Sequence, residues 1–286
     1  RAAWLEANRG LSPADMAMHV VLPEVDGRIF AGVASFKEPE EIDEVLQFAV
    51  IGHQPDEERI NAICTKIENW YKLQTTPIGE QKPALILSTY PGRPWQMAHA
   101  VGLDAIASAT AILDDIGHTT KKTKKPLEKL LMHKTLSWDI MSYKKALKNL
   151  PLNLQKELHT KWGLPETDLL ADNGSFNFAG LSIGNAIVAL QPERGIAKNK
   201  DSDYHNISHV PCHSYVAFYL WLQNGIKADS IIHIGAHGTL EWLPGKAVAL
   251  SDNCWPEVLA GNLPIIYPFI INDPGEAAQA KRRISA

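Results

Sequence analysis

The first quarter of the chain carries hydrophobic side chains at helical spacing. Two series stand out, namely Ile42, Val45, Leu46, Ala49, Val50 and then Ile60, Ile63, Ile67, Tyr71. Steps of three and four residues place such side chains on one face of a helix. We therefore expect helices over residues 1–20 and 38–74. In this interpretation residues 1–76 are a mainly helical segment of a preceding domain.

Short apolar runs bounded by turn-forming residues follow this segment. They predict strands at Pro83–Ser88, Ala186–Leu190, Ser230–Ile234 and Leu263–Ile271. Helical stretches lie between and after them, at Ala105–Ile116 with Gly117 as its C-cap, at Ser214–Gln223 and from Asp273 onwards.

Alternation of strands and helices in this order is typical of an α/β fold with a largely parallel sheet and flanking helices. Residues 77–286 are expected to form this α/β core, with a charge-rich helical insertion near residues 119–162. Ligands of such sheets bind beyond the carboxyl ends of the strands. Loops that follow the strands are therefore where a site is expected.

Composition narrows the class of protein. Hydrophobic residues make up 45% and charged residues 21%, which is the range of a packed domain. A formal charge of -4 gives no reason to expect nucleic acid binding, and no apolar window is long enough to span a membrane. Cys64, Cys212 and Cys254 are far apart and form no C-x-x-C pair, which favours the reducing cytoplasm. The chain also lacks an initiator Met, so we expect an internal fragment of a longer protein.

The densest polar cluster follows the strand predicted at Ser230–Ile234. It holds His233, His237 and Glu241 among glycines, and Lys246 follows. Glycine lets the backbone bend or approach a ligand, and His with Glu can hold a divalent ion and accept protons near neutral pH. A strand-end turn with a structural His and a capping Glu is the alternative, which spacing alone leaves open.

A second histidine group is spaced by four residues. It consists of His205, His209 and His213, with Cys212 inside it, but Pro211 interrupts any helix that would align them. The group is either a loop-borne metal site or a set of ordinary hydrogen-bonded histidines.

No nucleotide-binding motif is present. Gly245-Lys246 is not a phosphate loop, because Leu240 and Ala247 stand where that pattern needs Gly and Ser or Thr. Any ATP dependence would therefore come from a partner. No hydrolase motif supports a zinc hydrolase built on the histidines.

Several blocks of sequence resemble a known family. The run from His233 to Arg283 contains HIGAHGTLEWLPGK and NDPGEAAQAKRR, and upstream blocks include AMHVVLPEVDGRIF, KWGLPETD and VALQPERG. Together they resemble the large subunits of class I chelatases, and the cobaltochelatase (CobN) type more than the magnesium-chelatase H subunit. Departures fall at Cys212, Ser214, Ala236 and residues 93–96, and His209 does not fit the family pattern.

The resemblance implies a ligase that forms coordination complexes. Its activity would be ATP-driven insertion of Co²⁺ into hydrogenobyrinic acid a,c-diamide in aerobic cobalamin biosynthesis. An AAA+ ATPase subunit, with Mg²⁺ on its ATP, and a second small subunit would be the partners. The alternatives are a magnesium-chelatase H-type subunit that acts on protoporphyrin IX, and a non-catalytic tetrapyrrole-binding fragment.

Roles for individual residues follow from this chemistry as hypotheses. Glu241 and His237 are the expected catalytic pair, as general base and metal-delivering ligand. His233 and His213 would join His237 as metal ligands. The expected ring-binding residues, by charge or by a flat aromatic face, are Arg194, Lys246, Arg282, Trp242 and Tyr267.

Overall fold

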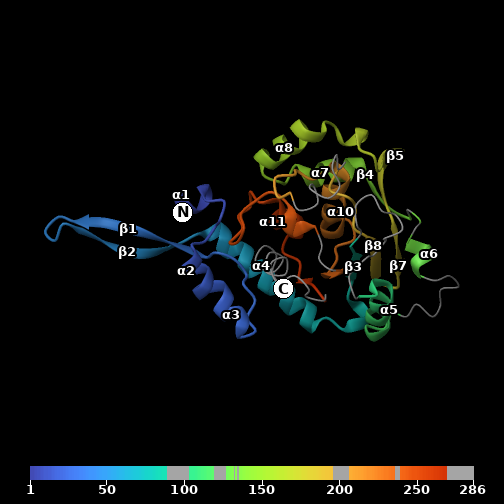
Figure 1. Cartoon of the computed structure of the whole chain (residues 1–286), viewed down its shortest axis with the longest axis horizontal. Helices are drawn as coiled ribbons and strands as arrows, with labels where there is room; N and C mark the ends of the chain where they lie inside the picture. Colours follow the sequence, from blue (N-terminus) through green and yellow to red (C-terminus); the bar gives the residue numbers. More distant parts are fainter. Residues whose placement is uncertain are drawn as a thin grey trace.

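The computed structural model describes residues 1–88, 103–118, 127–131, 133, 135–195, 206–235 and 239–268. A rounded α/β body contains most of these residues, and a long two-stranded hairpin projects from it on the side of the N-terminus (Figure 1). None of the helices in the described ranges is long and apolar enough to cross a membrane.

A five-stranded sheet lies at the centre of the body. Its strands, in spatial order, are β10 (Ile265–Ile266), β9 (Ser230–Ile234), β3 (Pro83–Leu87), β8 (Ala186–Leu190) and β7 (Gly180–Ile183). The first four are parallel to one another, and β7 pairs antiparallel with β8. The strands expected at Pro83–Ser88, Ala186–Leu190 and Ser230–Ile234 are confirmed, whereas the antiparallel edge strand was not predicted. Of the strand expected at Leu263–Ile271, the structure shows only Ile265–Ile266; residues 269–271 and the helix expected from Asp273 lie outside the described residues.

Both faces of this sheet are covered. Along β3, Ala84 and Ile86 belong to one hydrophobic core, and Leu85 and Leu87 belong to a second one on the other face. Parallel sheets of α/β proteins are buried on both faces in this way. This explains why β3 and β8 are continuous apolar runs in the sequence.

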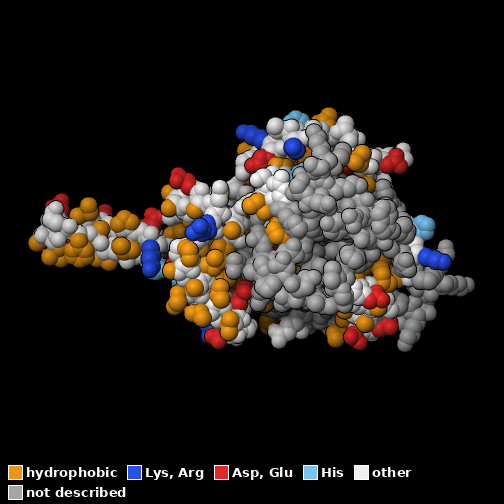
Figure 2. Space-filling view, viewed as in Figure 1, with side chains coloured by type: hydrophobic (Ala, Val, Ile, Leu, Met, Phe, Trp, Pro, Cys, Tyr) orange, Lys and Arg blue, Asp and Glu red, His pale blue; other side chains and the backbone are white. Residues whose placement is uncertain are grey.

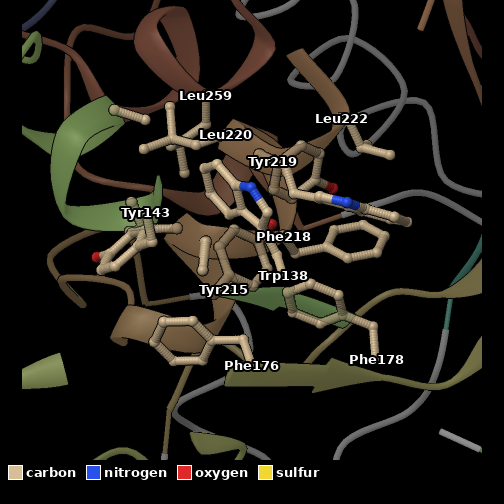
Figure 3. Close-up of a cluster of buried hydrophobic side chains, with 14 of the residues drawn as sticks. Trp138, Tyr143, Phe176, Phe178, Tyr215, Phe218, Tyr219, Leu220, Leu222 and Leu259 are labelled. Carbon is tan, nitrogen blue, oxygen red and sulfur yellow. The ribbon is translucent and has the colours of Figure 1, made fainter. Parts of the chain in front are cut away.

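The larger core is built around helix α10 (His213–Asn224). The ring of Phe218 from this helix packs on the ring of Phe178, with centroids 5.2 Å apart, and Tyr219 and Phe176 belong to the same core (Figure 3). The helix was expected at Ser214–Gln223, and this is confirmed. The second core contains α5 (Ala105–Asp115) and α6 (Leu127–Leu131).

Helix α5 begins and ends as the sequence predicts. The side chain of Asp104 accepts a hydrogen bond of 2.9 Å from the backbone N–H of Ala107, which caps the helix start. Gly117 follows the C-cap residue Ile116 with φ of 78°, a backbone conformation that glycine adopts without strain.

The middle segment is less helical than expected. Helices α7 (Ile140–Leu147) and α8 (Leu152–Trp162) are present, but β4 (Leu136–Asp139) lies within the predicted helical insertion. It pairs with β6 (Ser175–Phe178), which also pairs with β5 (Ala171–Asp172). Alternate residues of β4 are buried and exposed, so the true period here is two.

A larger correction concerns residues 35–55. The sequence was expected to be helical from residue 38, but it forms an antiparallel hairpin of β1 (Ser35–Asp43) and β2 (Phe48–Pro55). The Asp43 carboxylate accepts hydrogen bonds of 2.9 Å from the backbone N–H groups of Val45 and Leu46, which stabilises the turn. The helix begins only at α4 (Glu57–Thr75), capped by Asp56.

Several short elements complete the chain. They are α1 (Ala2–Glu6), α2 (Pro13–Met16), η1 (Ala17–Val21), α3 (Leu22–Val25), η2 (Ile78–Glu80), η5 (Pro165–Thr167), η6 (Leu240–Trp242) and α11 (Trp255–Ala260). The helical prediction for residues 1–20 agrees with α1, α2 and η1.

The N-terminal segment is tied to the body by polar contacts. The indole N–H of Trp4 donates to the carbonyl oxygen of Ala249 at 2.9 Å. From α4, Arg59 and Lys66 form ion pairs of 3.1 and 3.0 Å with Glu257 of α11. The domain boundary near residue 76 stays a prediction.

Candidate functional site

The carboxyl ends of three parallel strands meet at one level. Leu87 of β3 lies opposite Leu190 of β8 and Ile234 of β9. Hydrogen bonds of 3.0 Å continue past the strands, from the Ser88 N–H to the Ile234 carbonyl and from the Gln191 N–H to the Leu87 carbonyl. The residues that follow these strands are therefore held side by side, at the edge where a ligand is expected.

Gly235 allows β9 and β3 to stay close together at this edge. A Cβ atom at this position would lie 2.7 Å from Cβ and Oγ of Ser88, which is too close for any side chain. Glycine is required here because the ends of two strands, β9 and β3, approach each other closely.

Tyr267 joins two of the expected site residues. Its ring stacks on the ring of His233, with centroids 5.1 Å apart and planes 9° from parallel. Its hydroxyl donates a hydrogen bond of 3.2 Å to Oε2 of Glu241. The residue follows β10, while His233 lies in β9 and Glu241 in η6. Three segments thus contribute to one cluster, which we call the Glu241–Tyr267–His233 cluster.

Both polar members of the cluster are buried, since Glu241 and His233 are each 1% exposed. Burial lowers the pKa of His233 to about 3, because the charged imidazolium is poorly solvated there. The ring is therefore neutral at physiological pH. Its Nδ1 has no hydrogen-bond partner within the part of the chain that the structure describes.

A hydrogen-bond network lies behind the cluster. The Tyr219 hydroxyl lies 3.2 Å from Nε2 of His233, and the amide of Gln191 donates to both Tyr219 and Tyr215, at 2.5 and 3.3 Å. The Tyr215 hydroxyl is 2.7 Å from Oγ1 of Thr239. Buried polar groups linked in this way hold one another in fixed positions. The network therefore fixes His233 and the start of η6.

The sequence interpretation did not include these network residues. Tyr215 and Tyr219 lie four residues apart on α10, so both hydroxyls project from the same face of a helix whose central residues, 215–222, are otherwise apolar. That spacing was the available signal. Gln191 gave no signal beyond its place after a strand.

Arg194 and Trp242 lie beside the cluster but are engaged with the protein. The Arg194 guanidinium donates to the carbonyl oxygen of Trp242 at 2.8 Å and to that of Asn206 at 3.4 Å, and the residue is buried. Trp242 is partly buried. In this geometry Arg194 holds the η6 segment against the loop at Asn206, so its expected contact with ring carboxylates stays a prediction.

His213 is placed differently from the expected metal site. Its Nδ1 lies 2.7 Å from the Tyr143 hydroxyl, and its Nε2 lies 3.0 Å from the Gly163 carbonyl oxygen. Both ring nitrogens are thus engaged, and burial lowers the pKa of the residue. It also lies about 9 Å along α10 from Tyr219, which contacts His233. The structure does not bring His213 and His233 together.

Lys246 is directed towards the N-terminal segment. Its ammonium donates to the carbonyl oxygens of Leu5 and Ala7 at 2.9 and 2.8 Å and lies 5.5 Å from the centre of the Trp4 ring. Burial lowers the pKa of this ammonium. Its expected contact with a substrate carboxylate would require these bonds to break.

His237 and Arg282 lie outside the described residues, as does His205 of the second histidine group. Within the described ranges no group of three or more His, Cys, Asp or Glu side chains is arranged to hold a metal ion. Of the expected site residues, the structure therefore brings together Glu241, His233 and Tyr267.

Comparison with known proteins gives a consistent family. A family model described as CobN/Magnesium Chelatase matches residues 1–286. The aerobic cobaltochelatase subunits CobN of Pseudomonas aeruginosa and of a Sinorhizobium species are 39% and 37% identical over 100% of this chain. The solved catalytic subunit of cobaltochelatase from Mycobacterium tuberculosis is 34% identical, with a TM-score of 0.83 over 99% of this chain.

These relatives are much longer than the chain. The 286 residues span 24% of each of the two curated relatives and 25% of the solved one. The similarity therefore concerns about a quarter of those proteins.

Proposed function

Because the chain belongs to the CobN/magnesium chelatase family, we propose that it forms part of the tetrapyrrole- and metal-binding large subunit of an ATP-dependent cobaltochelatase. The substrate metal is Co²⁺ and the ring is hydrogenobyrinic acid a,c-diamide. The Glu241–Tyr267–His233 cluster at the carboxyl edge of the sheet is the observation that carries this proposal.

Inserting an ion into the ring is a proton-transfer reaction. The inner N–H proton of the corrin leaves the ring, and the nitrogen lone pair that it releases joins those of the other three ring nitrogens in binding the metal. A carboxylate next to the ring nitrogens can accept such a proton. Glu241 is the proposed base, and the Tyr267 hydroxyl, which donates to Oε2, orients its carboxylate.

His233 is proposed to bind the metal ion as a neutral ligand. A neutral imidazole binds a borderline metal ion without adding a charge that would trap the ion. Its low pKa and the unoccupied hydrogen-bonding capacity of Nδ1 among the described residues support this role. His237, which follows Gly235 closely in sequence, remains proposed as the ligand that delivers the ion.

ATP hydrolysis is assigned to another subunit. The sequence contains no phosphate-loop motif, since Leu240 and Ala247 replace its required residues. An AAA+ ATPase subunit and a second small subunit would therefore complete the enzyme. The chain would act in the complex as the part that holds ring and metal.

Substitution of Glu241 by Gln tests the base assignment. In the complete large subunit with its ATPase partners, Glu241→Gln should lower the rate of Co²⁺ insertion by about 100-fold or more, the usual contribution of a general base. Tetrapyrrole binding, followed by the shift in absorbance of the ring, should change little. The exposed carboxylate Glu166 provides the matched control Glu166→Gln, which should leave the rate unchanged. An unchanged rate in Glu241→Gln would rule out the proposed base.

The metal and ring are tested in the same assay. Co²⁺ and Mg²⁺ are each offered with the corrin and with protoporphyrin IX. Insertion of Co²⁺ into the corrin alone supports the proposal. Insertion of Mg²⁺ into protoporphyrin IX would instead assign the chain to the magnesium branch of its family.

A further inference from the structure

The β1–β2 hairpin is an apolar element that the rest of the described chain leaves uncovered. Among the strands that the structure describes, these two pair only with each other, and the hairpin extends away from the body (Figure 1). Its contacts with the body are near its base, where Phe36 packs on Trp4 with ring centroids 5.0 Å apart. The large apolar side chains beyond the base are 52% to 89% exposed, namely Ile42, Val45, Leu46, Phe48, Val50 and Ile51.

Apolar side chains lie on both faces of this hairpin. Phe48 and Val50 point to one face, while Ile51 points to the other, where it lies opposite Pro39. Hydrophobic side chains line the hairpin and continue across the neighbouring N-terminal helices (Figure 2). On those helices Met18, Leu22 and Val25 are 53% to 79% exposed.

Such an element does not persist alone in water. An isolated two-stranded hairpin is marginally stable at best, and a large exposed apolar patch marks an interaction surface. Because neither face is covered by the described residues, the surface that binds the hairpin must contact both faces. A groove or cleft satisfies this requirement, whereas a flat surface does not.

The charges of the hairpin indicate what surrounds that groove. Residues 35–55 contain five acidic side chains, Glu38, Glu40, Glu41, Asp43 and Glu44, against the single Lys37. Lys or Arg side chains around the groove would complement them. A second copy of the same hairpin would bring acidic side chains together, which disfavours pairing between two copies.

We propose that the hairpin inserts into an apolar groove edged by basic side chains, formed by the three quarters of the chelatase subunit that this chain does not match. The relatives carry that polypeptide, since the chain spans 24% of their length. A surface that is apolar on both faces needs permanent cover, and a contact within one subunit provides it. The inference needs the family relationship but not the proposed base chemistry.

Photo-cross-linking in the complete large subunit tests this contact. A photoreactive benzoylphenylalanine is placed at position 50 or 51, one on each face of the hairpin. Met141, which is 73% exposed on α7, provides the matched control position. We expect both hairpin positions to cross-link to peptides outside residues 1–286 at the mass of one subunit, and the control position to give none. A covalent dimer, a link only to the ATPase partner, or the absence of a link would overturn the proposal.

A charge placed in the contact gives a second measurement. In the complete subunit, Ile51→Asp should raise the rate of proteolytic cleavage within residues 35–55 by about tenfold or more. Met141→Asp should leave that rate unchanged. Equal cleavage of the unmodified subunit and Ile51→Asp would show that the hairpin is not covered. The proposed base is tested separately, by cobalt insertion in Glu241→Gln. Failure of the hairpin contact and failure of the proposed base can therefore be recognised independently.

Discussion

Tyr267 is the residue through which Glu241 and His233 are connected. Its ring contacts the imidazole, and its hydroxyl contacts the carboxylate. Neither of these two polar residues is adjacent to it in sequence, and each was expected from the strand-end motif alone. The sequence interpretation assigned Tyr267 a different part, as a flat face for the ring. The structure shows that this face is stacked on His233.

Tyr267→Phe separates the two contacts. The variant keeps the stacked ring but removes the hydrogen bond to Glu241, so the carboxylate is less well oriented. Loss of one hydrogen bond to a charged group corresponds to about 1.5–3 kcal/mol, and the rate of cobalt insertion should fall by about 10- to 100-fold. An unchanged rate in Tyr267→Phe would show that the hydroxyl does not orient the Glu241 carboxylate.

Acid should destabilise the protein through His233. Its pKa is about 3 in the folded state, below the ordinary value of 6.5, so the unfolded state binds the extra proton. The stability contributed by the neutral ring is therefore fully present above pH 6.5 and is lost as pH falls from 6.5 towards 3. Within this window the free energy of unfolding should drop by about 1.4 kcal/mol per pH unit for this one group.

His233→Gln is the comparison that isolates this effect. Denaturant unfolding is measured at several pH values between 4 and 7, and the slope should be smaller in the variant. His213 remains and contributes in the same direction, since burial also lowers its pKa. Identical slopes for the two proteins would contradict the assignment to His233.

At the scale of elements, the strands of the sheet were predictable and the hairpin was not. The sequences of β3 and β8 are continuous apolar runs, and β9 is apolar apart from Ser230 and His233, because the sheet is buried on both faces. The apolar spacing of residues 42–50 also fits a helical period, but within the described residues no part of the body packs against this segment. The period of an uncovered element is not fixed by a core, so its apolar spacing carries little information.

The polar network was hidden from the sequence for a related reason. Tyr215 and Tyr219 occupy helix positions that pack like the apolar ones around them. Only the three-dimensional meeting of α10 with the ends of β8 and β9 gives their hydroxyls partners. Glu241 and His233 could be selected from the sequence because they lie at the carboxyl end of a predicted parallel strand, where ligands of such sheets bind.

Helix α4 is joined to α11 through a single carboxylate. Glu257 accepts from both Arg59 and Lys66, and all three side chains are largely buried. Its removal leaves two cations close together without their counter-charge. Glu257→Ala should therefore lower the free energy of unfolding by about 3 kcal/mol. The exposed ion pair of Lys144 with Glu166 offers the control, and Lys144→Ala should leave the unfolding midpoint within error. Equal effects of the two substitutions would show that Glu257 does not hold the two helices together.

At the scale of the whole molecule, the candidate site is assembled from segments far apart in sequence. Gln191, His233, Glu241 and Tyr267 belong to the ends of three strands and to η6. Parallel strands cannot pair until the chain between them has been made, and such long-range pairing is slow.

The position of Tyr267, just after the last strand of the sheet, has a consequence for biosynthesis. When a ribosome has synthesised β9 and η6, the chain already contains His233 and Glu241. Tyr267, which contacts both residues, has not yet been added. The stack of Tyr267 on His233 and its hydrogen bond to Glu241 can therefore form only after β10 has been made. The Glu241–Tyr267–His233 cluster is thus completed late in synthesis, after β3, β8 and β9 have all left the ribosome.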